Sequence, residues 1–244
     1  MQARRRRGSM QGRRRSGLTQ VPRQRGLTHT RPGRPLRISV GLPATACATP
    51  GAANLPGMST TQNFGATDLA ALAPGVEGLI GDIRSDHAGE TGAVMIYRGI
   101  LAAARDPAVR AFATEHMATE QNHLDLLGAL LPPGQRSVLL PIWRVAGFLT
   151  GFLPALVGSR AVYATIDAVE TFVDHHYEEQ IRKLPTTGPG GALRATLIQC
   201  QADEVHHRDE ARDMQTAPHG ALLRGWAWMV GAGSKAAVSA ARRI

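Results

Sequence analysis

Hydrophobic positions recur at three- and four-residue steps along most of the chain after residue 67, which is the spacing of a helix with one buried face. In the first such segment the repeating positions are Ile80, Ile83, His87, Glu90 and Val94. The pattern predicts helices over residues 68–105, with a break around Pro74–Gly75, and over 107–131, 161–184 and 193–214. These elements indicate an all-α protein.

Proline, glycine and capping residues mark the ends of the predicted helices. Asp106 is a suitable N-cap for a helix with Pro107 in its first turn, and Pro132–Pro133–Gly134 ends that helix. Residues 186–191 are rich in Gly and Pro and predict a loop.

Residues 138–158 are almost entirely apolar, and Arg144 is their only charged residue. The length reaches the minimum for a membrane span, but Arg144 and two prolines, Pro141 and Pro154, argue against a straight one. We expect an amphipathic helix at a membrane interface, with Trp143 and Arg144 near the lipid headgroups. A helix buried in the protein core is the alternative.

The C-terminal segment from Ala221 has a further apolar stripe, formed by Leu222, Leu223, Trp226, Met229 and Val230. This stripe predicts either a helix that caps the bundle or a second membrane-interface element.

Charge divides the chain into two parts. Residues 1–67 contain 12 Arg and no Lys, Asp or Glu, whereas the remainder has 16 basic and 19 acidic residues. The N-terminal part cannot bury enough apolar surface to fold, so we predict a disordered extension followed by one domain over residues 68–244. Because the net charge of +9 is a property of the extension, it does not indicate that the folded part binds nucleic acid.

Three explanations fit the Arg-rich extension. It resembles a mitochondrial transit peptide, and it is equally what a misassigned start would add upstream of a true start at Met58. The scarcity of Lys and abundance of Ala, Gly and Arg favour a bacterial protein and the misassigned start. A nucleic-acid-binding arm is the third explanation. Two unrelated cysteines, Cys47 and Cys200, fit a reducing compartment.

Two copies of the pattern Glu-x-x-His carry the most specific candidate chemistry. They are Glu120–His123 and Glu204–His207, each within a predicted helix. Side chains three residues apart on a helix are about 60° apart around its axis and about 4.5 Å apart along it, so both can reach one metal ion. Taken alone, Glu120 and His123 are equally well explained as a hydrogen-bonded surface pair.

A single glutamate precedes each pair. Glu90 lies 30 residues before Glu120, and Glu170 lies 34 residues before Glu204. The small residues around Glu90 leave room for a ligand; they are Ala88, Gly89, Gly92 and Ala93. One Glu from each of two helices and Glu-x-x-His from each of two others form the ligand set of a ferritin-like four-helix di-iron or di-manganese bundle.

Electrostatics supports a pair of metal ions. Four carboxylates with two neutral imidazoles carry a charge of about −4, and burying it unpaired would cost several kcal/mol per ion. Two divalent cations cancel that charge. A carboxylate and imidazole set suits iron or manganese, and the lack of thiolate argues against a structural zinc site.

Some neighbouring residues compete with this set or support it. Asp203–His206 has the same spacing as Glu204–His207, which we favour because it matches the other half chemically. Asp203 then becomes a carboxylate that orients a metal-bound imidazole. Near Glu170, we expect His175 and His176 to be packing residues or partners of the ligands.

The sequence motifs around these candidate ligands resemble those of the demethoxyubiquinone hydroxylases of ubiquinone biosynthesis. The similarity covers residues 80–244 and includes residues 83–90, above all Asp86-His87-Ala88-Gly89-Glu90, then Ile96-Tyr97, Ala168-Val169-Glu170, His175-His176-Tyr177, Asp203-Glu204 and His207-Arg208-Asp209. Pro141-x-Trp143 with its apolar run is similar to the membrane-facing segment of that family.

The resemblance implies a di-iron monooxygenase that hydroxylates the ring of a polyprenylated methoxy-benzoquinone, using O₂ and electrons from NADH or NADPH. It implies iron ligation by Glu90, Glu120, His123, Glu170, Glu204 and His207, with Glu120 and Glu204 as bridges, and support from Asp86, Asp203 and His176. It also implies that the enzyme acts at a membrane surface, where some members of the family use a lipid-binding partner protein. We expect the cytoplasmic side of a bacterial membrane or, alternatively, the matrix side of the mitochondrial inner membrane.

Two other functions compete with this one. A ferroxidase or iron-storage bundle uses similar ligands without a quinone, but the apolar segments at 138–158 and 221–230 fit it poorly. A non-enzymatic membrane scaffold leaves the six ligands unexplained. The sequence has neither a G-x-G-x-x-G after a strand nor a cysteine cluster, so we expect the electrons to come from transient docking or from a separate protein.

Overall fold

The computed structural model describes residues 69–244, and this part of the chain contains helices and no strands. A short helix, α1 (Leu69–Leu72), is followed by α2 (Leu79–Ala103), α3 (Pro107–Leu130), the 3₁₀ turn η1 (Pro133–Gln135), α4 (Leu140–Val157), α5 (Ser159–Ile181), α6 (Gly188–Asp213) and α7 (Ala221–Ala241). The predicted all-α class is confirmed. The predicted N-terminal extension, residues 1–67 with Cys47 and Met58, lies outside the described residues.

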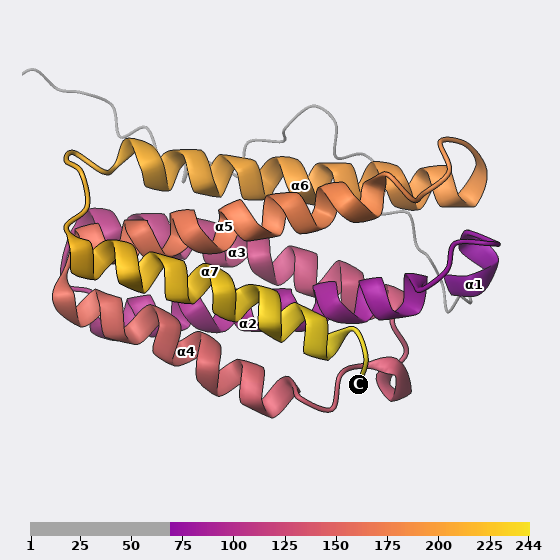
Figure 1. Ribbon diagram of the computed structural model, residues 1–244, viewed down its shortest axis with the longest axis horizontal. Coiled ribbons are helices and arrows are strands. Elements are labelled where there is room, and N and C mark those ends of the chain that lie inside the picture. The colour runs from indigo at the N-terminus through magenta and orange to yellow at the C-terminus, as the bar shows by residue number, and fades with distance from the viewer. Residues whose placement is uncertain (1–68) are drawn as a thin grey trace, which may run out of the picture. The chain divides into compact units, whose positions relative to one another are not determined.

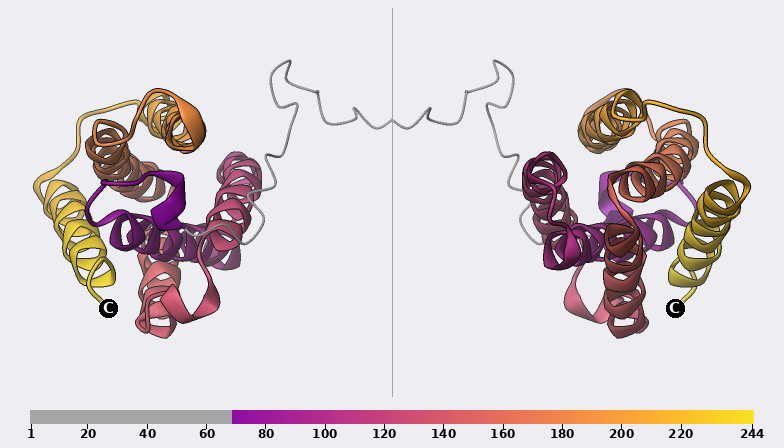
Figure 2. Two further views of the ribbon diagram at one scale, coloured as in Figure 1. Left: turned by 90° about the vertical axis from the view of Figure 1, so that its right-hand side faces the viewer. Right: turned by 90° about the vertical axis from the view of Figure 1, so that its left-hand side faces the viewer.

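The four helices that carry the predicted ligands form the bundle, and α4 and α7 lie along its outside (Figure 1). Helix α2 packs along α3, and α5 packs along α6. The view along the helix axes shows α4 beside α2, and α7 beside α5 (Figure 2), and α7 also packs against α2. The bundle thus consists of two helix pairs facing each other, the arrangement in which side chains from both pairs can share a metal site.

The predicted helix limits are confirmed at two places. Asp106 caps α3, because its carboxylate accepts a hydrogen bond from the backbone N–H of Ala108 at 2.9 Å. The predicted break near Pro74–Gly75 separates α1 from α2. Gly75 and Gly78 have φ of 84° and 76° there, which favours glycine.

The predicted loop at residues 186–191 is wrong in part, because α6 already begins at Gly188 rather than at Leu193. Pro189 is the physical reason, since proline in a first helical turn loses no hydrogen bond. Gly190 allows a close approach to the preceding chain: a Cβ atom there would lie 2.9 Å from the ring of Pro185.

Helix α4 is an outer helix held against the bundle by glycines. A Cβ atom on Gly151 would lie 1.9 Å from the carbonyl oxygen of Ile96, and one on Gly147 would lie 2.4 Å from that of Gly92. These close contacts seat one narrow face of α4 on α2 and leave the rest uncovered.

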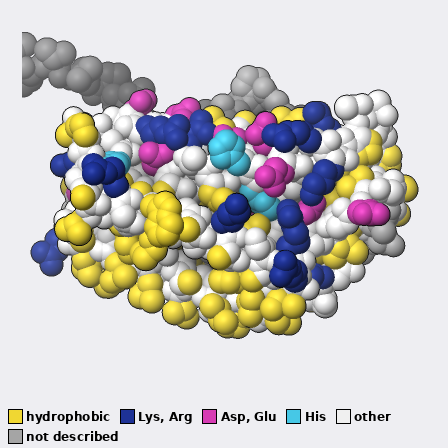
Figure 3. Space-filling view, in the orientation of Figure 1, with side chains coloured by type: hydrophobic (Ala, Val, Ile, Leu, Met, Phe, Trp, Pro, Cys, Tyr) yellow, Lys and Arg dark blue, Asp and Glu magenta, His cyan; other side chains and the backbone are white. Residues whose placement is uncertain are grey.

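The uncovered face of α4 is apolar. Its exposed side chains are Ile142, Val145, Leu149, Leu153, Leu156 and Val157. Figure 3 shows hydrophobic side chains gathered over α4, while charged side chains lie mainly over α5 and α6. Among residues 69–244, α4 alone is long and apolar enough to cross a membrane, and 22% of it is buried. The alternative of a buried core helix is therefore wrong, and binding to a membrane interface stays a prediction.

The predicted single stripe on α7 divides into two faces. Trp226 and Val230 face the bundle, where the Trp226 indole N–H donates to Thr165 at 2.8 Å. Leu222 and Met229 are exposed, at 93% and 50%. Neighbouring helical positions differ by about 100°, so a run of adjacent apolar residues covers both directions. Helix α7 thus covers the bundle and also has an apolar outer face.

Candidate metal centre

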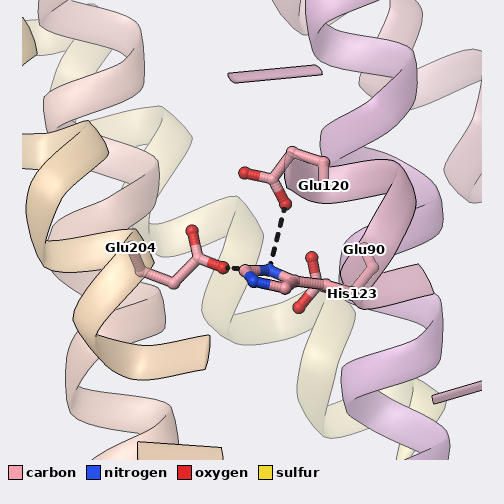
Figure 4. A group of neighbouring side chains, drawn as sticks. All are labelled: Glu90, Glu120, His123 and Glu204. Atoms are coloured by element: carbon pink, nitrogen blue, oxygen red, sulfur yellow. Dashed lines mark hydrogen bonds and ion pairs between the residues drawn. The ribbon is translucent and has the colours of Figure 1, made fainter. Parts of the chain in front are cut away.

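The structure brings the six predicted ligands together in two overlapping groups. Donor atoms of Glu90, Glu120, His123 and Glu204 lie within 4.8 Å of one another, and so do those of Glu120, Glu170, Glu204 and His207. Figure 4 shows the first group, in which the four side chains converge from α2, α3 and α6. All six residues are buried, so the groups lie inside the bundle.

Glu120 and Glu204 belong to both groups. His123 Nδ1 lies 3.0 Å from Glu204 Oε1, and His207 Nδ1 lies 3.0 Å from Glu120 Oε1. Each helix pair thus supplies one imidazole that reaches the carboxylate of the opposite pair. Two metal ions bound in these groups would both have Glu120 and Glu204 within reach, whereas Glu90 and Glu170 each belong to one group.

Several donor atoms of the centre lack a hydrogen-bond partner among the described residues. These buried atoms are both carboxylate oxygens of Glu120, Glu204 Oε2 and His207 Nδ1. Glu120 and His207 are close, but their atoms are not aligned for a hydrogen bond. Buried polar atoms are normally paired, so convergent unpaired oxygen and nitrogen atoms fit a metal site.

Burial is the main influence on the two terminal carboxylates. It raises the pKa of Glu90 and of Glu170 well above the usual range of a carboxyl group, and the nearby Glu120 and Glu204 carboxylates raise both pKa values further. Without a compensating positive charge, each is therefore inclined to hold a proton. A bound cation would reverse this preference.

Contacts between carboxylates and imidazoles shift other pKa values in the centre, lowering that of Glu204 and raising that of His207. Burial disfavours ionisation of Glu204, but its hydrogen bond with His123 and its ion pair with His207 outweigh burial and lower its pKa to about 2. Burial also lowers the pKa of His207, yet its contacts with Glu120 and Glu204 raise that pKa to about 9. The centre therefore favours carboxylates that interact with protonated imidazoles, and a metal ion would replace those protons.

Burial distinguishes the two registers considered for α6. Glu204 and His207 are each 1% exposed, whereas the side chains of Asp203 and His206 are 35% and 69% exposed. Asp203 instead takes a supporting position, since its Oδ2 lies 3.1 Å from His123 Nε2. This contact leaves Nδ1 of His123 directed at Glu204 and fixes the orientation of the ring.

The predicted supporting residues Asp86 and His176 lie beside the centre and contact each other. His176 Nε2 is 2.9 Å from Asp86 Oδ1, and the His176 ring stacks on Phe172. His175 faces outward with 71% of its side chain exposed, so the expectation that it packs or supports a ligand is wrong. Adjacent helical residues point about 100° apart, which explains why only one of the two histidines turns inward.

Sequence reasoning did not assign a role to three residues near the centre. Tyr177 donates a hydrogen bond of 2.6 Å to Glu90 Oε1. The His116 ring centroid lies 4.1 Å from that of His207, and Tyr97 packs against both rings. Helical spacing was the available signal, because His116 precedes Glu120 by four residues and Tyr177 follows Glu170 by seven.

A cavity of about 280 Å³ adjoins the centre and is lined mainly by apolar side chains. Glu90 and Glu170 lie on its wall, and so do the four small residues Ala88, Gly89, Gly92 and Ala93. Other parts of the wall come from α4 and α7, including Trp143 and Val230. Trp143 is half-buried on this wall and Arg144 is exposed, and their position near lipid headgroups stays a prediction.

Residues 79–241 match the family described as Ubiquinone biosynthesis protein COQ7. The chain is 34% identical over 167 residues to an NADPH-dependent 3-demethoxyubiquinone 3-hydroxylase, mitochondrial, of Dictyostelium discoideum and to a 3-demethoxyubiquinol 3-hydroxylase of Rhodospirillum rubrum. Each alignment covers 66% of this chain and 76% of the relative. A Mus musculus protein with the same name as the first is 35% identical over 168 residues, which cover 66% of this chain and 76% of that protein.

Proposed function

Because the chain belongs to the COQ7 family of ubiquinone biosynthesis proteins, we propose that it is an O₂-dependent hydroxylase of a polyprenylated methoxy-benzoquinone intermediate in ubiquinone biosynthesis. The observation that carries the proposal is the buried set of four carboxylates and two imidazoles beside an apolar cavity. The set supplies donors for an O₂-reactive metal pair, and the cavity supplies a dry site for an apolar ring.

The proposed metal ligands are Glu90, Glu120, His123, Glu170, Glu204 and His207, holding two iron ions. The unpaired buried atoms of Glu120, Glu204 and His207 fit this assignment, as does the absence of thiolate among the donors. A bound iron pair supplies the redox chemistry that activates O₂, which no side chain can provide.

The chain's own residues position the ligands and exclude water. Tyr177 holds one oxygen of Glu90 by its hydrogen bond, and Asp203 holds the ring of His123. The neighbouring apolar cavity lowers the local dielectric, which strengthens electrostatic interactions at the centre. The small residues next to Glu90 let a planar ring approach the ligands from the side of α2.

We propose that a membrane surface covers the exposed apolar faces of α4 and α7. Both helices contribute to the wall of the cavity, so a substrate with a polyprenyl tail could pass from lipid to the centre without crossing water. Arg144 and Arg224 are exposed on these helices and are suited to anionic headgroups. Peripheral binding fits α4 better than a full span, because one face of this helix is packed on α2 through Gly147 and Gly151.

The reductant is proposed to be NADH or NADPH, by similarity to the relatives with NADPH-dependent names. A lipid-binding accessory protein is a further proposed partner. For localisation we propose the cytoplasmic side of a bacterial membrane, with the matrix side of the mitochondrial inner membrane as the alternative. The mitochondrial relative of Dictyostelium discoideum and the relative of Rhodospirillum rubrum are both 34% identical to the chain.

The proposal is tested by supplying iron-loaded protein with a short-chain methoxy-methyl-benzoquinone or its quinol, a reductant and ¹⁸O₂. We expect a hydroxylated ring that carries ¹⁸O from O₂, and no ¹⁸O when the label is in the water. Iron oxidation without ring hydroxylation would instead support the ferroxidase function.

A further inference from the structure

A buried polar cluster occupies the part of the cavity wall next to Glu90, and the proposed metal site does not use it. Its members are Ser85, Asp86, His176 and Gln180, from α2 and α5. Ser85, Asp86 and His176 line the cavity, and each of the four is less than a tenth exposed. Burying polar groups lowers the stability of a protein unless they are paired, so a polar cluster beside an apolar cavity is a candidate for binding a ligand.

All contacts of His176 with the cluster are made through one ring nitrogen. Nε2 lies 3.2 Å from Ser85 Oγ, 2.9 Å from Asp86 Oδ1 and 2.9 Å from Gln180 Nε2. No hydrogen bond among residues 69–244 involves Nδ1 of His176. Because His176 lines the cavity, Nδ1 is the ring nitrogen left for a molecule bound there.

The partners of Nε2 determine where the proton of the neutral imidazole lies. The hydroxyl of Ser85 donates its only proton to the carbonyl oxygen of Asp82 at 2.7 Å, so towards His176 it can only accept. The Asp86 carboxylate is also an acceptor, and Gln180 gives one of its two amide protons to this carboxylate at 2.6 Å, while the same amide nitrogen lies 2.9 Å from Nε2. A hydrogen bond from Nε2 to the charged Asp86 carboxylate is stronger than one from the neutral Gln180 amide to Nε2, and Ser85 is a second acceptor there. These partners favour a proton on Nε2, which leaves a lone pair on Nδ1.

A lone pair on Nδ1 distinguishes between the two oxidation states of a quinone ring. A quinol carries hydroxyl groups that can donate to Nδ1, whereas the oxygens of a quinone can only accept and would face the lone pair without a proton between them. The relatives' names include both a demethoxyubiquinol and a demethoxyubiquinone hydroxylase, so the names alone leave the oxidation state open.

We propose that His176 Nδ1, oriented by Asp86 and Ser85, accepts a hydrogen bond from a ring hydroxyl and makes the cavity selective for the quinol. This inference rests on the proposed function, because it assumes that the cavity binds a quinone-type ring. His176 is then the residue that recognises the oxidation state of the substrate, and Asp86 and Ser85 are positioning residues.

The test measures binding of a methoxy-methyl-hydroquinone with a decyl side chain and of the benzoquinone with the same substituents. Full-length protein loaded with Zn²⁺ is used without oxygen, so that neither metal nor probe changes oxidation state. One neutral hydrogen bond is worth about three- to tenfold in affinity, so we expect the quinol to bind about three- to tenfold more tightly than the quinone.

The matched variant is His176→Gln. The glutamine amide can occupy the place of Nε2 and keep the contact with Asp86, but it has no group at the place of Nδ1. We expect the preference for the quinol to disappear while affinity for the quinone stays within about twofold, less than one hydrogen bond. His176→Phe, which keeps the stack on Phe172, is the second variant and should give the same loss.

A second readout is independent of ligand binding. In ¹⁵N NMR spectra of the Zn²⁺-loaded protein, we expect the proton of His176 on Nε2, and Asp86→Asn should weaken that preference. A proton on Nδ1 in the wild-type protein would overturn the inference. So would equal binding of both probes, or a preference that survives in His176→Gln, and these results would leave the proposed function intact. If neither probe binds the wild-type protein, the proposed function fails together with the inference.

Discussion

The phenol of Tyr177 donates a hydrogen bond of 2.6 Å to Oε1 of Glu90, and the two residues are 87 positions apart in the chain. The contact joins α5 to α2 across the bundle and involves a carboxylate on the wall of the cavity. It holds one oxygen of Glu90 in place, which leaves the other oxygen to face the centre. The relationship thus links the position of a proposed ligand to a residue outside the ligand set.

Tyr177→Phe removes this hydrogen bond and leaves the aromatic ring. Since partners of metal ligands typically contribute about tenfold or more to metal affinity, we expect iron binding to weaken by about tenfold while the fold is kept. Competition with a coloured chelator measures the affinity. Tyr163→Phe is the matched control, because the Tyr163 hydroxyl is buried without a partner among the described residues. Equal iron affinity in both variants would contradict the role of Tyr177.

Glu204→Ala removes one of the two carboxylates shared between the proposed metal positions. We expect loss of hydroxylase activity and of most bound iron, because both positions lose a ligand. His206→Ala is the control for the competing register, and its exposed side chain predicts normal iron content. Iron content that falls in His206→Ala and stays normal in Glu204→Ala would mean that the register assigned to α6 is wrong.

Gly151→Ala tests how α4 is seated. Its methyl group would lie 1.9 Å from the carbonyl oxygen of Ile96, so the helix must move away, at a cost of about 1–3 kcal/mol in the free energy of unfolding. Gly225→Ala on α7 meets nothing within 4 Å and should be neutral or stabilising by up to about 1 kcal/mol, since alanine favours helix. Urea denaturation compares the two variants, and equal stability would contradict the close packing of α4 on α2.

Membrane binding is expected to depend on the apolar face of α4. Val145→Asp combined with Leu149→Asp should reduce co-sedimentation with anionic vesicles by at least about tenfold, because each change replaces apolar area with a charge at the interface. Ile198→Asp is the control, since Ile198 is an exposed apolar residue on α6, away from α4. A similar reduction in both proteins would indicate non-specific adsorption.

His87 gives a prediction for pH dependence. Burial, followed by the positive charges of Arg136 and Arg144, lowers its pKa from 6.5 to about 4 in the folded protein. Between these values the unfolded chain binds a proton that the folded chain does not, so the free energy of unfolding decreases as pH falls from about 6.5 to about 4. Above about pH 6.5 this contribution is fully present.

His87→Gln should therefore show a smaller loss of stability between pH 7.5 and pH 5 than the wild-type protein, with both measured by urea denaturation in metal-free form. The comparison removes the contributions of other titrating groups, which both proteins share. His175→Gln is the control, because this side chain is exposed, and it should keep the wild-type dependence. An unchanged slope in His87→Gln would contradict the role assigned to burial of His87.

The positions of the ligand residues could be predicted because helix geometry is local. A spacing of three residues places Glu204 and His207 on one face wherever the helix lies, and their chemistry selected the register that burial now supports. The contact between Tyr177 and Glu90 depends on how α5 packs against α2. Such packing is set by many distant side chains, so no local pattern in the sequence indicates it.

The packing of the outer helices, α4 and α7, likewise could not be predicted from a local sequence pattern. Hydropathy indicates that residues 138–158 are apolar, but it cannot tell which face packs on the bundle. The face of α4 that packs is the one with Gly147 and Gly151, where backbones approach closely, and this places Trp143 on the cavity side. On α7, the run of adjacent apolar residues gave one predicted stripe where the structure has an inner and an outer face.

The amount of iron bound per chain, measured after anaerobic reconstitution of the protein from Met58, tests the central claim most directly. The account predicts about two tightly bound irons and an optical change when O₂ is added, because the two ligand groups share Glu120 and Glu204. Folded, helical protein that binds no iron tightly would contradict the di-iron centre and the hydroxylase function that depends on it.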